Sequence, residues 1–398
     1  MTERPVGERI AEARKRKGLS QRELAALMDR SESWVSQVER GVMPVDRLAL
    51  LQKLGEVLET SFLAVEQEAG ADGTYPTPVD HDLEQLRNVL TGHPSISTLF
   101  GDEPEPIDFE QLRDDIDHAW EQARNTNFTR LAEVLPKLEL AARGTNSQPE
   151  ILGLLARSYQ AAAAGFARQD EGGAAWIAAD RAVRCAEASG DPLQVAASHF
   201  RLAHTLIRTR RNDQAERAAT TAADALRPAV EAGTASIEHQ SLLGAMLLVL
   251  AALAGFERDR TRARTYLDEA DTIAEQVGDG RNDYDTEFGP TNVAIHRVSI
   301  AVDLGDAGEA IDTAATINAS ALSSERQMRL RLDTARAHIQ RREPELALAD
   351  LLAGELAAPE NMRSHRLAHQ AVSDLLGILP APPESDLAGL AVRTGVIR

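Results

Sequence analysis

Apolar residues recur at helical spacing along most of the chain, and no long stretch alternates apolar and polar positions as a strand would. Helix-forming residues dominate, and aromatic residues make up only 4% of the sequence. We therefore predict an all-α fold. Clusters of Gly, Pro, Asn and Asp separate a group of short helices at the N-terminus from a long series of longer ones.

The first 66 residues predict five short helices. Ser20 and Glu23 have the spacing of a capping box, which starts the second helix. The third helix begins at Ser31 or Ser33 and ends at Gly41. Inward-facing positions are apolar throughout: Val6, Ile10 and Ala13; Leu24, Leu27 and Met28; Val35 and Val38; Val45, Leu48, Leu51, Leu54 and Leu58; and Leu63.

The remaining residues predict a domain of stacked helices. After one helix near 82–90, helical segments are expected at 107–124, 127–143, 149–168, 174–189, 192–208, 213–231, 236–256, 260–277, 290–304 and 307–317, with three more ending near Leu379. Related helices start roughly every 40–48 residues, which indicates an internal repeat. We thus expect a first domain at 1–66, a Gly/Pro-rich linker at 67–80, a helical repeat domain at 81–380 and a C-terminal tail at 381–398.

The formal net charge of −19 is unevenly distributed. Residues 1–66 contain 11 basic and 11 acidic side chains, so the whole excess of negative charge belongs to the rest of the chain. A neutral domain can still bind phosphates if its basic groups share a face, and an acidic body limits non-specific binding to DNA.

Cysteine content and hydropathy favour a cytoplasmic protein. Cys185 is the single cysteine, which excludes an intrachain disulfide and a cysteine-based zinc site and fits a reducing compartment. The N-terminus has no apolar signal core. The most apolar run, 242–256, is too short to cross a bilayer and predicts a buried helix, so no membrane partner is expected.

The third predicted helix carries side chains suited to reading DNA. Opposite Val35 and Val38, Gln37 can bind adenine through two hydrogen bonds, and Glu32 can accept one from cytosine. Trp34 could pack on a thymine methyl group or on the backbone. With the nearby basic residues, the expected DNA contacts are Gln21, Glu32, Ser33, Trp34, Ser36, Gln37, Arg14, Lys15, Lys17, Arg40 and Arg47.

The combination of Leu-Ser-Gln at 19–21, Glu-Leu-Ala at 23–25 and Val-Ser-Gln-Val-Glu-Arg-Gly at 35–41 resembles the Cro/CI-like (XRE) helix-turn-helix regulators. The resemblance implies that Gln21 contacts a phosphate and that Glu32, Ser33 and Gln37 read base edges. It also implies an ion pair between Glu39 and Arg14, so Arg14 has two interpretations, a phosphate contact or this ion pair.

One position departs from that family. The turn after the second helix commonly begins with glycine, and here Asp29 stands there. Because aspartate tolerates the left-handed region better than most residues, we expect mild strain and an intact turn.

The body resembles the degenerate tetratricopeptide-like sensor half of actinobacterial XRE-type regulators, particularly at Phe-Gly-Pro-Thr-Asn-Val-Ala-Ile-His, 288–296. More distantly, the layout is similar to peptide-pheromone receptor regulators. In such solenoids the first helix of each pair lines a concave groove. Asn292, His296 and Ser299 share one helix face. Candidate ligand contacts are Asn292, His296, His199 and Arg201.

No cofactor, metal or enzymatic activity is predicted. His365 and His369 are four residues apart, but the glutamate of a zinc protease is missing between them, and we interpret them as surface residues. The acidic residues between Asp279 and Glu287 lack the spacing of a calcium loop and predict a solvated turn. Cys185 is expected to pack inside an Ala-rich helix.

The sequence therefore favours a transcriptional regulator that binds an inverted-repeat operator in double-stranded DNA as a homodimer. The repeat domain would respond to a peptide or small-molecule effector. The alternative is a DNA-tethered scaffold that binds other proteins and has no small effector.

Overall fold

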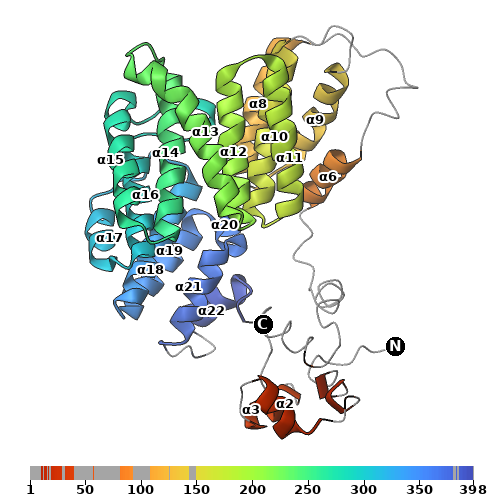
Figure 1. Cartoon of the computed structure of the whole chain (residues 1–398), viewed down its shortest axis with the longest axis vertical. Helices are drawn as coiled ribbons and strands as arrows, with labels where there is room; N and C mark the ends of the chain where they lie inside the picture. Colours follow the sequence, from red (N-terminus) through yellow and green to blue (C-terminus); the bar gives the residue numbers. More distant parts are fainter. Residues whose placement is uncertain are drawn as a thin grey trace. The chain divides into compact units, whose positions relative to one another are not determined.

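The computed structural model describes residues 10–11, 13–15, 17, 19–28, 32–39, 57, 81–92, 108–124, 126–142, 149–379, 382 and 385–397, without the side chains of 32–34 and of a few other residues. The chain divides into two compact units, 1–80 and 81–398 (Figure 1). Within the described residues every regular element is a helix, as the sequence predicts.

The N-terminal unit contains α2 (Gln21–Met28) and α3 (Glu32–Glu39). The side chains expected inside are buried in it: Ile10, Ala13, Leu24, Met28, Val35 and Val38. The prediction for Leu27 is wrong, because this side chain is 52% exposed. Leu24, Ala25 and Met28 fill the inward face of the short α2, and Leu27 falls outside that stripe. The fourth and fifth predicted helices lie outside the described residues, apart from Val57.

The second unit is a series of antiparallel helices. They are α6 (His81–Thr91), α8 (Phe109–Arg124), α9 (Thr129–Ala141), α10 (Pro149–Arg168), α11 (Gly172–Ser189), α12 (Pro192–Arg208), α13 (Asn212–Glu231), α14 (Ile237–Phe256), α15 (Arg260–Val277), the short 3₁₀ helix η1 (Asp283–Asp285), α16 (Pro290–Leu304), α17 (Ala307–Ala314), α18 (Ser324–Gln340), α19 (Pro344–Ala357), α20 (Pro359–Ser364), α21 (Arg366–Leu376) and α22 (Asp386–Arg393).

The helices of the second unit stack as a repeat. The first helices of successive pairs, α10, α12, α14, α16 and α18, contact one another in chain order, and each packs on the second helix of its own pair (Figure 1). This arrangement gives one layer of first helices and one of second helices, as in an α-solenoid.

A left-handed residue follows the first helix of each pair: Asp170, Arg210, Arg258, Gly305 and Arg342. The next residue then donates its backbone N–H to the carbonyl five positions earlier, for example from Glu171 to Phe166 at 2.9 Å. This is the hydrogen bond of a Schellman ending, which reverses the chain sharply. The same turn thus recurs at every pair, although only one of its left-handed residues is glycine.

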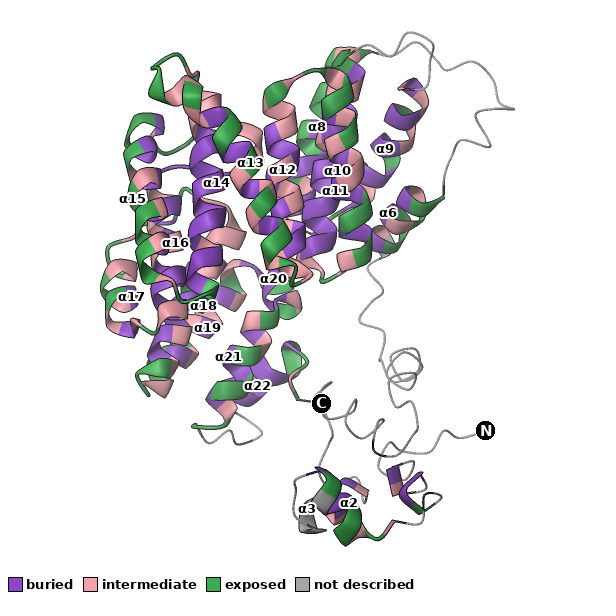
Figure 2. Cartoon of the chain, viewed as in Figure 1, coloured by how far each residue is buried: buried purple, intermediate pink, exposed green. Residues whose placement is uncertain are grey.

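The centre of the second unit is α14, which is buried along most of its length (Figure 2). It is long and apolar enough to cross a membrane, but 78% of its most apolar window is buried inside the protein. Neighbouring helices α12, α13, α15 and α16 pack around it. The buried helix predicted for 242–256 is confirmed, but the expectation that the apolar run is too short to cross a bilayer is wrong, because α14 begins earlier, at Ile237.

The end of the chain differs from the prediction. After α17 the structure has four helices up to Leu376 where three were expected, because His365 separates α20 from α21. The segment 381–398, expected as a tail, contains α22, whose Leu387, Leu390 and Ala391 are buried in the core. The apolar pattern of α22 covers only eight residues, which is too short to predict a helix from periodicity.

A glycine in α14 lets an aromatic ring lie directly on the helix backbone. A Cβ atom at Gly244 would come within 2.0 Å of the ring of Phe288, which is only 2% exposed. We predict that Gly244→Ala destabilises the second unit by about 1–3 kcal/mol, because the ring has no space to move. The midpoint of urea unfolding measures this change.

Gly153, inside α10, provides the matched control. No atom lies within 4 Å of a Cβ placed there. Gly153→Ala should therefore raise stability by up to about 1 kcal/mol through helix propensity alone. A Gly244→Ala variant that gained stability in the same way would contradict the proposed close packing.

Candidate nucleic-acid interface and repeat-unit cavity

Three helical segments of the N-terminal unit meet at a buried ion pair. The Arg14 guanidinium donates to Glu39 through Nε at 2.5 Å and through Nη2 at 3.0 Å. It also donates to the backbone carbonyl of Leu19 at 2.6 Å. Gln21, at the start of α2, donates to the same Glu39 carboxylate at 2.7 Å. This network, which we call the polar lock, connects the first helical segment to α2 and α3.

The polar lock keeps Glu39 ionised. Burial opposes the charge, but the hydrogen bonds from Arg14 and Gln21 outweigh it and hold the pKa of Glu39 below its usual value. The structure forms the Arg14–Glu39 ion pair that was one of two interpretations of Arg14. Because Arg14 is only 8% exposed, we assign it a structural role rather than a phosphate contact.

The capping box of α2 is formed as predicted. The Glu23 carboxylate accepts from the backbone N–H and the hydroxyl of Ser20, both at 2.7 Å. In return, Ser20 Oγ accepts from the backbone N–H of Glu23 at 3.2 Å. These bonds fix where α2 begins and therefore where Gln21 lies.

The α3 helix presents two faces. Val35 and Val38 are buried, whereas Ser36 and Gln37 are half-buried on the other side. The backbone of residues 32–34 belongs to α3, but the side chains of Glu32, Ser33 and Trp34 lie outside the described part, as do Arg40, Arg47 and the turn at Asp29. The buried Val35 and Val38 thus fix the orientation of α3, and Ser36 and Gln37 lie away from the core.

Basic side chains of the first helical segment are exposed. Lys15 and Lys17 both face solvent, and Lys17 Nζ also donates to the carbonyl of Val57 at 2.6 Å. Exposed ammonium groups are suited to contacts with phosphates.

Sequence comparison agrees with this geometry. Residues 5–67 match a family described as "Helix-turn-helix domain". The N-terminal unit is a helix-turn-helix domain. In the helix-turn-helix domain, α2 and α3 are the two helices joined by the turn, and α3 is the one expected to enter the major groove.

The comparisons add little for the second unit. No curated protein matches the chain. Among solved structures, BtubC (BKLC) from P. vanneervenii is similar over 70% of this chain and 97% of its own, with 16% sequence identity and a TM-score of 0.37. A likeness at this level does not bear on function.

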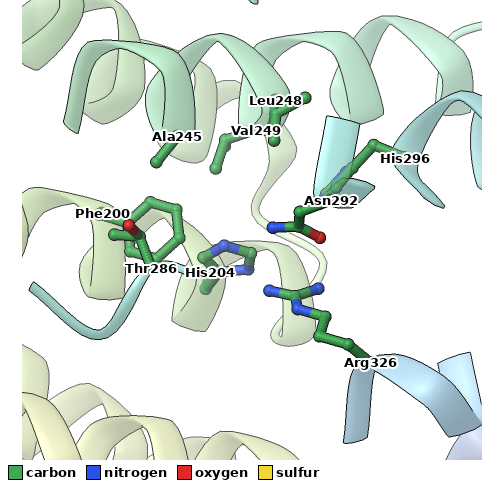
Figure 3. A pocket seen from close by; sticks show the side chains of 9 residues that line it. All are labelled: Phe200, His204, Ala245, Leu248, Val249, Thr286, Asn292, His296 and Arg326. Atoms are coloured by element: carbon green, nitrogen blue, oxygen red, sulfur yellow. The ribbon is translucent and has the colours of Figure 1, made fainter. Parts of the chain in front are cut away.

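The repeat unit has a small, partly open cavity of about 10 Å³ between α12, α14, α16 and α18 (Figure 3). Asn292 and His296, two of the predicted ligand contacts, line it, and Asn292 is only 2% exposed. Ala245, Leu248 and Val249 of α14 form an apolar wall opposite them. Figure 3 shows Asn292, His204 and the Arg326 guanidinium pointing into the same space.

The other two candidates do not line this cavity. His199 contacts the carbonyl of Val195 in its own helix through Nδ1, at 3.0 Å. Arg201 donates to the backbone carbonyls of Tyr284 and Asp285, and its guanidinium lies over the rings of Trp120 and Phe200. Ser299, on the face shared with Asn292, accepts from Arg329 at 2.8 Å.

Sequence reasoning missed His204 and Arg326, which complete the polar side of the cavity. His204 is four residues after Phe200, and their rings meet edge to face at 4.5 Å. Because residues four apart share one face of a helix, the sequence could have predicted that His204 lies beside Phe200. Arg326 gave no such signal, because the helical residues that it joins at the cavity, from Phe200 to His296, all lie 30 or more residues earlier in the sequence.

The prediction of a solvated acidic turn at 279–287 is wrong, because each carboxylate has a specific partner. Asp279 accepts a hydrogen bond from Thr291, and Asp283 accepts from Ser241 and Arg281. Asp285 forms ion pairs with Arg124 and Arg157. Glu287 accepts from the backbone N–H of Ser323. The turn thus connects α8, α10, α14, α16 and the start of α18. Tyr284, Asp285 and Glu287 adopt positive φ, as a tightly held segment can.

His365 is also misassigned as a surface residue. It is 8% exposed, and its Nδ1 accepts the backbone N–H of Leu367, which caps α21. Cys185 is half-buried, and burial raises the pKa of its thiol to about 11, so it packs rather than reacts. No group of residues that could hold a metal ion occurs in the described part of the chain.

Proposed function

We propose that this protein is a cytoplasmic, sequence-specific transcriptional regulator that binds DNA as a homodimer and has no enzymatic activity. The observation that carries the proposal is the helix-turn-helix domain, with Val35 and Val38 holding α3 so that Ser36 and Gln37 lie on its other side. Gln21, Lys15 and Lys17 would contact phosphates. Glu32, Ser33 and Trp34, at the start of α3, would join Gln37 at the bases.

Two copies of α3 would enter successive major grooves of an inverted repeat. The half-sites would then lie one or two helical turns apart, at roughly 34 Å per turn. Arg40, directly after α3, would add a phosphate contact, and Arg47, further along the chain, would contact a phosphate or the minor groove. The repeat unit would supply the dimer interface. It would also respond to an effector, because several polar atoms buried among its helices have no hydrogen-bond partner.

The Gln37→Ala variant tests the DNA contact. On a duplex enriched by the wild-type protein from random DNA, we expect affinity to fall by about 1–3 kcal/mol, with relaxed preference at one base pair, since a bidentate contact to adenine is lost. Electrophoretic mobility shift at moderate salt measures both quantities.

Gln111→Ala, an exposed glutamine of α8, is the matched control and should bind like the wild type. If Gln37→Ala kept both the affinity and the sequence preference, the proposed base contact would be removed. A complex with a single chain on the enriched duplex would contradict the homodimer.

A further inference from the structure

Positive charge is concentrated inside an acidic protein. Arg201 and Arg208 project from α12, Arg168 ends α10, and Arg326 lies in the first turn of α18. Burial, together with Arg168 and Arg326 among other neighbours, lowers the pKa of Arg201 to about 10, so these guanidinium groups lie near one another and stay charged at neutral pH. A chain with a net charge of −19 has therefore gathered four half-buried cations in one region of its repeat unit.

Carboxylates neutralise only part of this charge. Glu325 is 3.8 Å from Arg168, and Glu287 is 3.6 Å from Arg326. Within the described residues, Arg208 forms no hydrogen bond and no ion pair within 4.0 Å, and Arg201 hydrogen-bonds only backbone carbonyls. Two guanidinium groups, those of Arg201 and Arg208, thus have no carboxylate within 4.0 Å among the described residues.

Buried polar atoms in the same region lack partners. They are the Nε atoms of Arg168, Arg201 and Arg326, the hydroxyl of Thr205 and the Oδ1 atom of Asn292. A buried polar group without a hydrogen bond is costly, so such groups mark places where another molecule can bind. Two of these atoms belong to residues that line the cavity: Arg326 Nε, an N–H donor that an oxyanion can satisfy, and Asn292 Oδ1, an acceptor.

We propose that the cavity lined by His204, Asn292, His296 and Arg326 binds a small molecule through an oxyanion, either a phosphate or a carboxylate. Arg326 supplies the charge-assisted hydrogen bond, and the neighbouring Arg201 and Arg208 add positive potential. The Asn292 amide and the two histidines complete the polar side. Ala245, Leu248 and Val249 form the apolar wall of the cavity.

The inference rests on the proposed effector-responsive role of the repeat unit. It is tested without DNA, so that failure of anion binding and failure of DNA binding are separate results. The melting temperature of the full chain is measured at constant ionic strength in chloride, in 10 mM inorganic phosphate and in 10 mM acetate. We expect at least one oxyanion to raise the Tm by about 2–4 °C through binding to the folded state.

Two variants locate the effect. Arg326→Gln should abolish the oxyanion-dependent rise, and Asn292→Leu should reduce it while keeping the basal Tm at or above that of the wild type, because an unpaired buried amide is removed. Arg217→Gln, an exposed arginine of α13, should retain the full rise. A rise in phosphate alone identifies a phosphate ligand, and a rise in acetate alone identifies a carboxylate.

The proposal is overturned if neither anion raises the Tm. It is equally overturned if the rise persists in both Asn292→Leu and Arg326→Gln, since the anion would then bind elsewhere. Should Arg326→Gln fail to fold, Asn292→Leu alone decides between these outcomes.

Discussion

Acidification from pH 8 to pH 5.5 is expected to destabilise the repeat unit by up to about 4 kcal/mol. Three histidines carry this prediction. Burial and the neighbouring arginines lower the pKa of His204 to about 3 and hold the pKa values of His296 and His365 well below 6.5. All three are therefore neutral in the folded protein throughout this range.

The sign follows from proton binding. In the unfolded chain each histidine takes up a proton as the pH falls through about 6.5, and in the folded chain it does not. The unfolded state thus binds more protons at lower pH, and the free energy of unfolding falls with pH. The groups that face His204 are Arg201, Arg208 and Arg326, with Glu325 opposing them, so the surroundings remain positive. Burial opposes the charge of Glu325, but the arginines still lower its pKa to about 2, so it stays ionised above pH 5.

Urea midpoints at pH 8.0, 6.5 and 5.5, followed by circular dichroism, measure the effect. His204→Gln should remove about a third of the loss, because one proton is no longer taken up on unfolding. His118→Gln, an exposed histidine of α8, should leave the loss unchanged. Equal stability at pH 8.0 and 5.5 would show that the three histidines are not held neutral by the arginines.

Replacing Glu39 with alanine is expected to cost the helix-turn-helix domain about 3 kcal/mol, because it leaves the Arg14 charge buried without its partner. The side chains of this pair are 10% and 6% exposed. Gln21 loses its bond to the same carboxylate. The angle between α2 and α3 would no longer be fixed, and DNA affinity should fall with it.

Hydrogen exchange of the full chain, read by mass spectrometry, locates this effect. Peptides covering 21–39 should exchange about 100-fold faster in Glu39→Ala. Glu23→Ala, the exposed glutamate of the capping box, is the control and should cost only about 1 kcal/mol. Equal effects of the two substitutions would contradict the structural role of the polar lock. The Arg14→Met/Glu39→Leu double variant should recover most of the stability.

The sequence was sufficient for the features that depend on nearby residues. The capping box of Ser20 and Glu23 needs a separation of only three residues, and the bounds of α10, α12, α15 and α16 follow from helical periodicity with Pro, Asp or Gly at the ends. The Arg14–Glu39 pair came from the family resemblance, which supplied a contact between two helices that local pattern could not give.

Features formed by distant residues were not predictable in this way. Arg326 meets His204 and Asn292 only because the helix pairs stack. How far one pair is shifted along the next cannot be predicted from the spacing of residues in a single sequence. The acidic turn was misread for the same reason, since Arg124 and Arg157 lie more than 100 residues before Asp285. The error at Leu27 is a local one, because the predicted apolar face of α2 included a position that the structure leaves exposed.

Selection of duplexes from a random DNA pool by the full-length protein tests the central claim most directly. The account predicts enrichment of one inverted repeat, with half-sites one or two turns apart and with binding that depends on Gln37. Recovery of no preferred sequence, or of DNA that binds Gln37→Ala and the wild type equally at every position, would contradict the role assigned to α3.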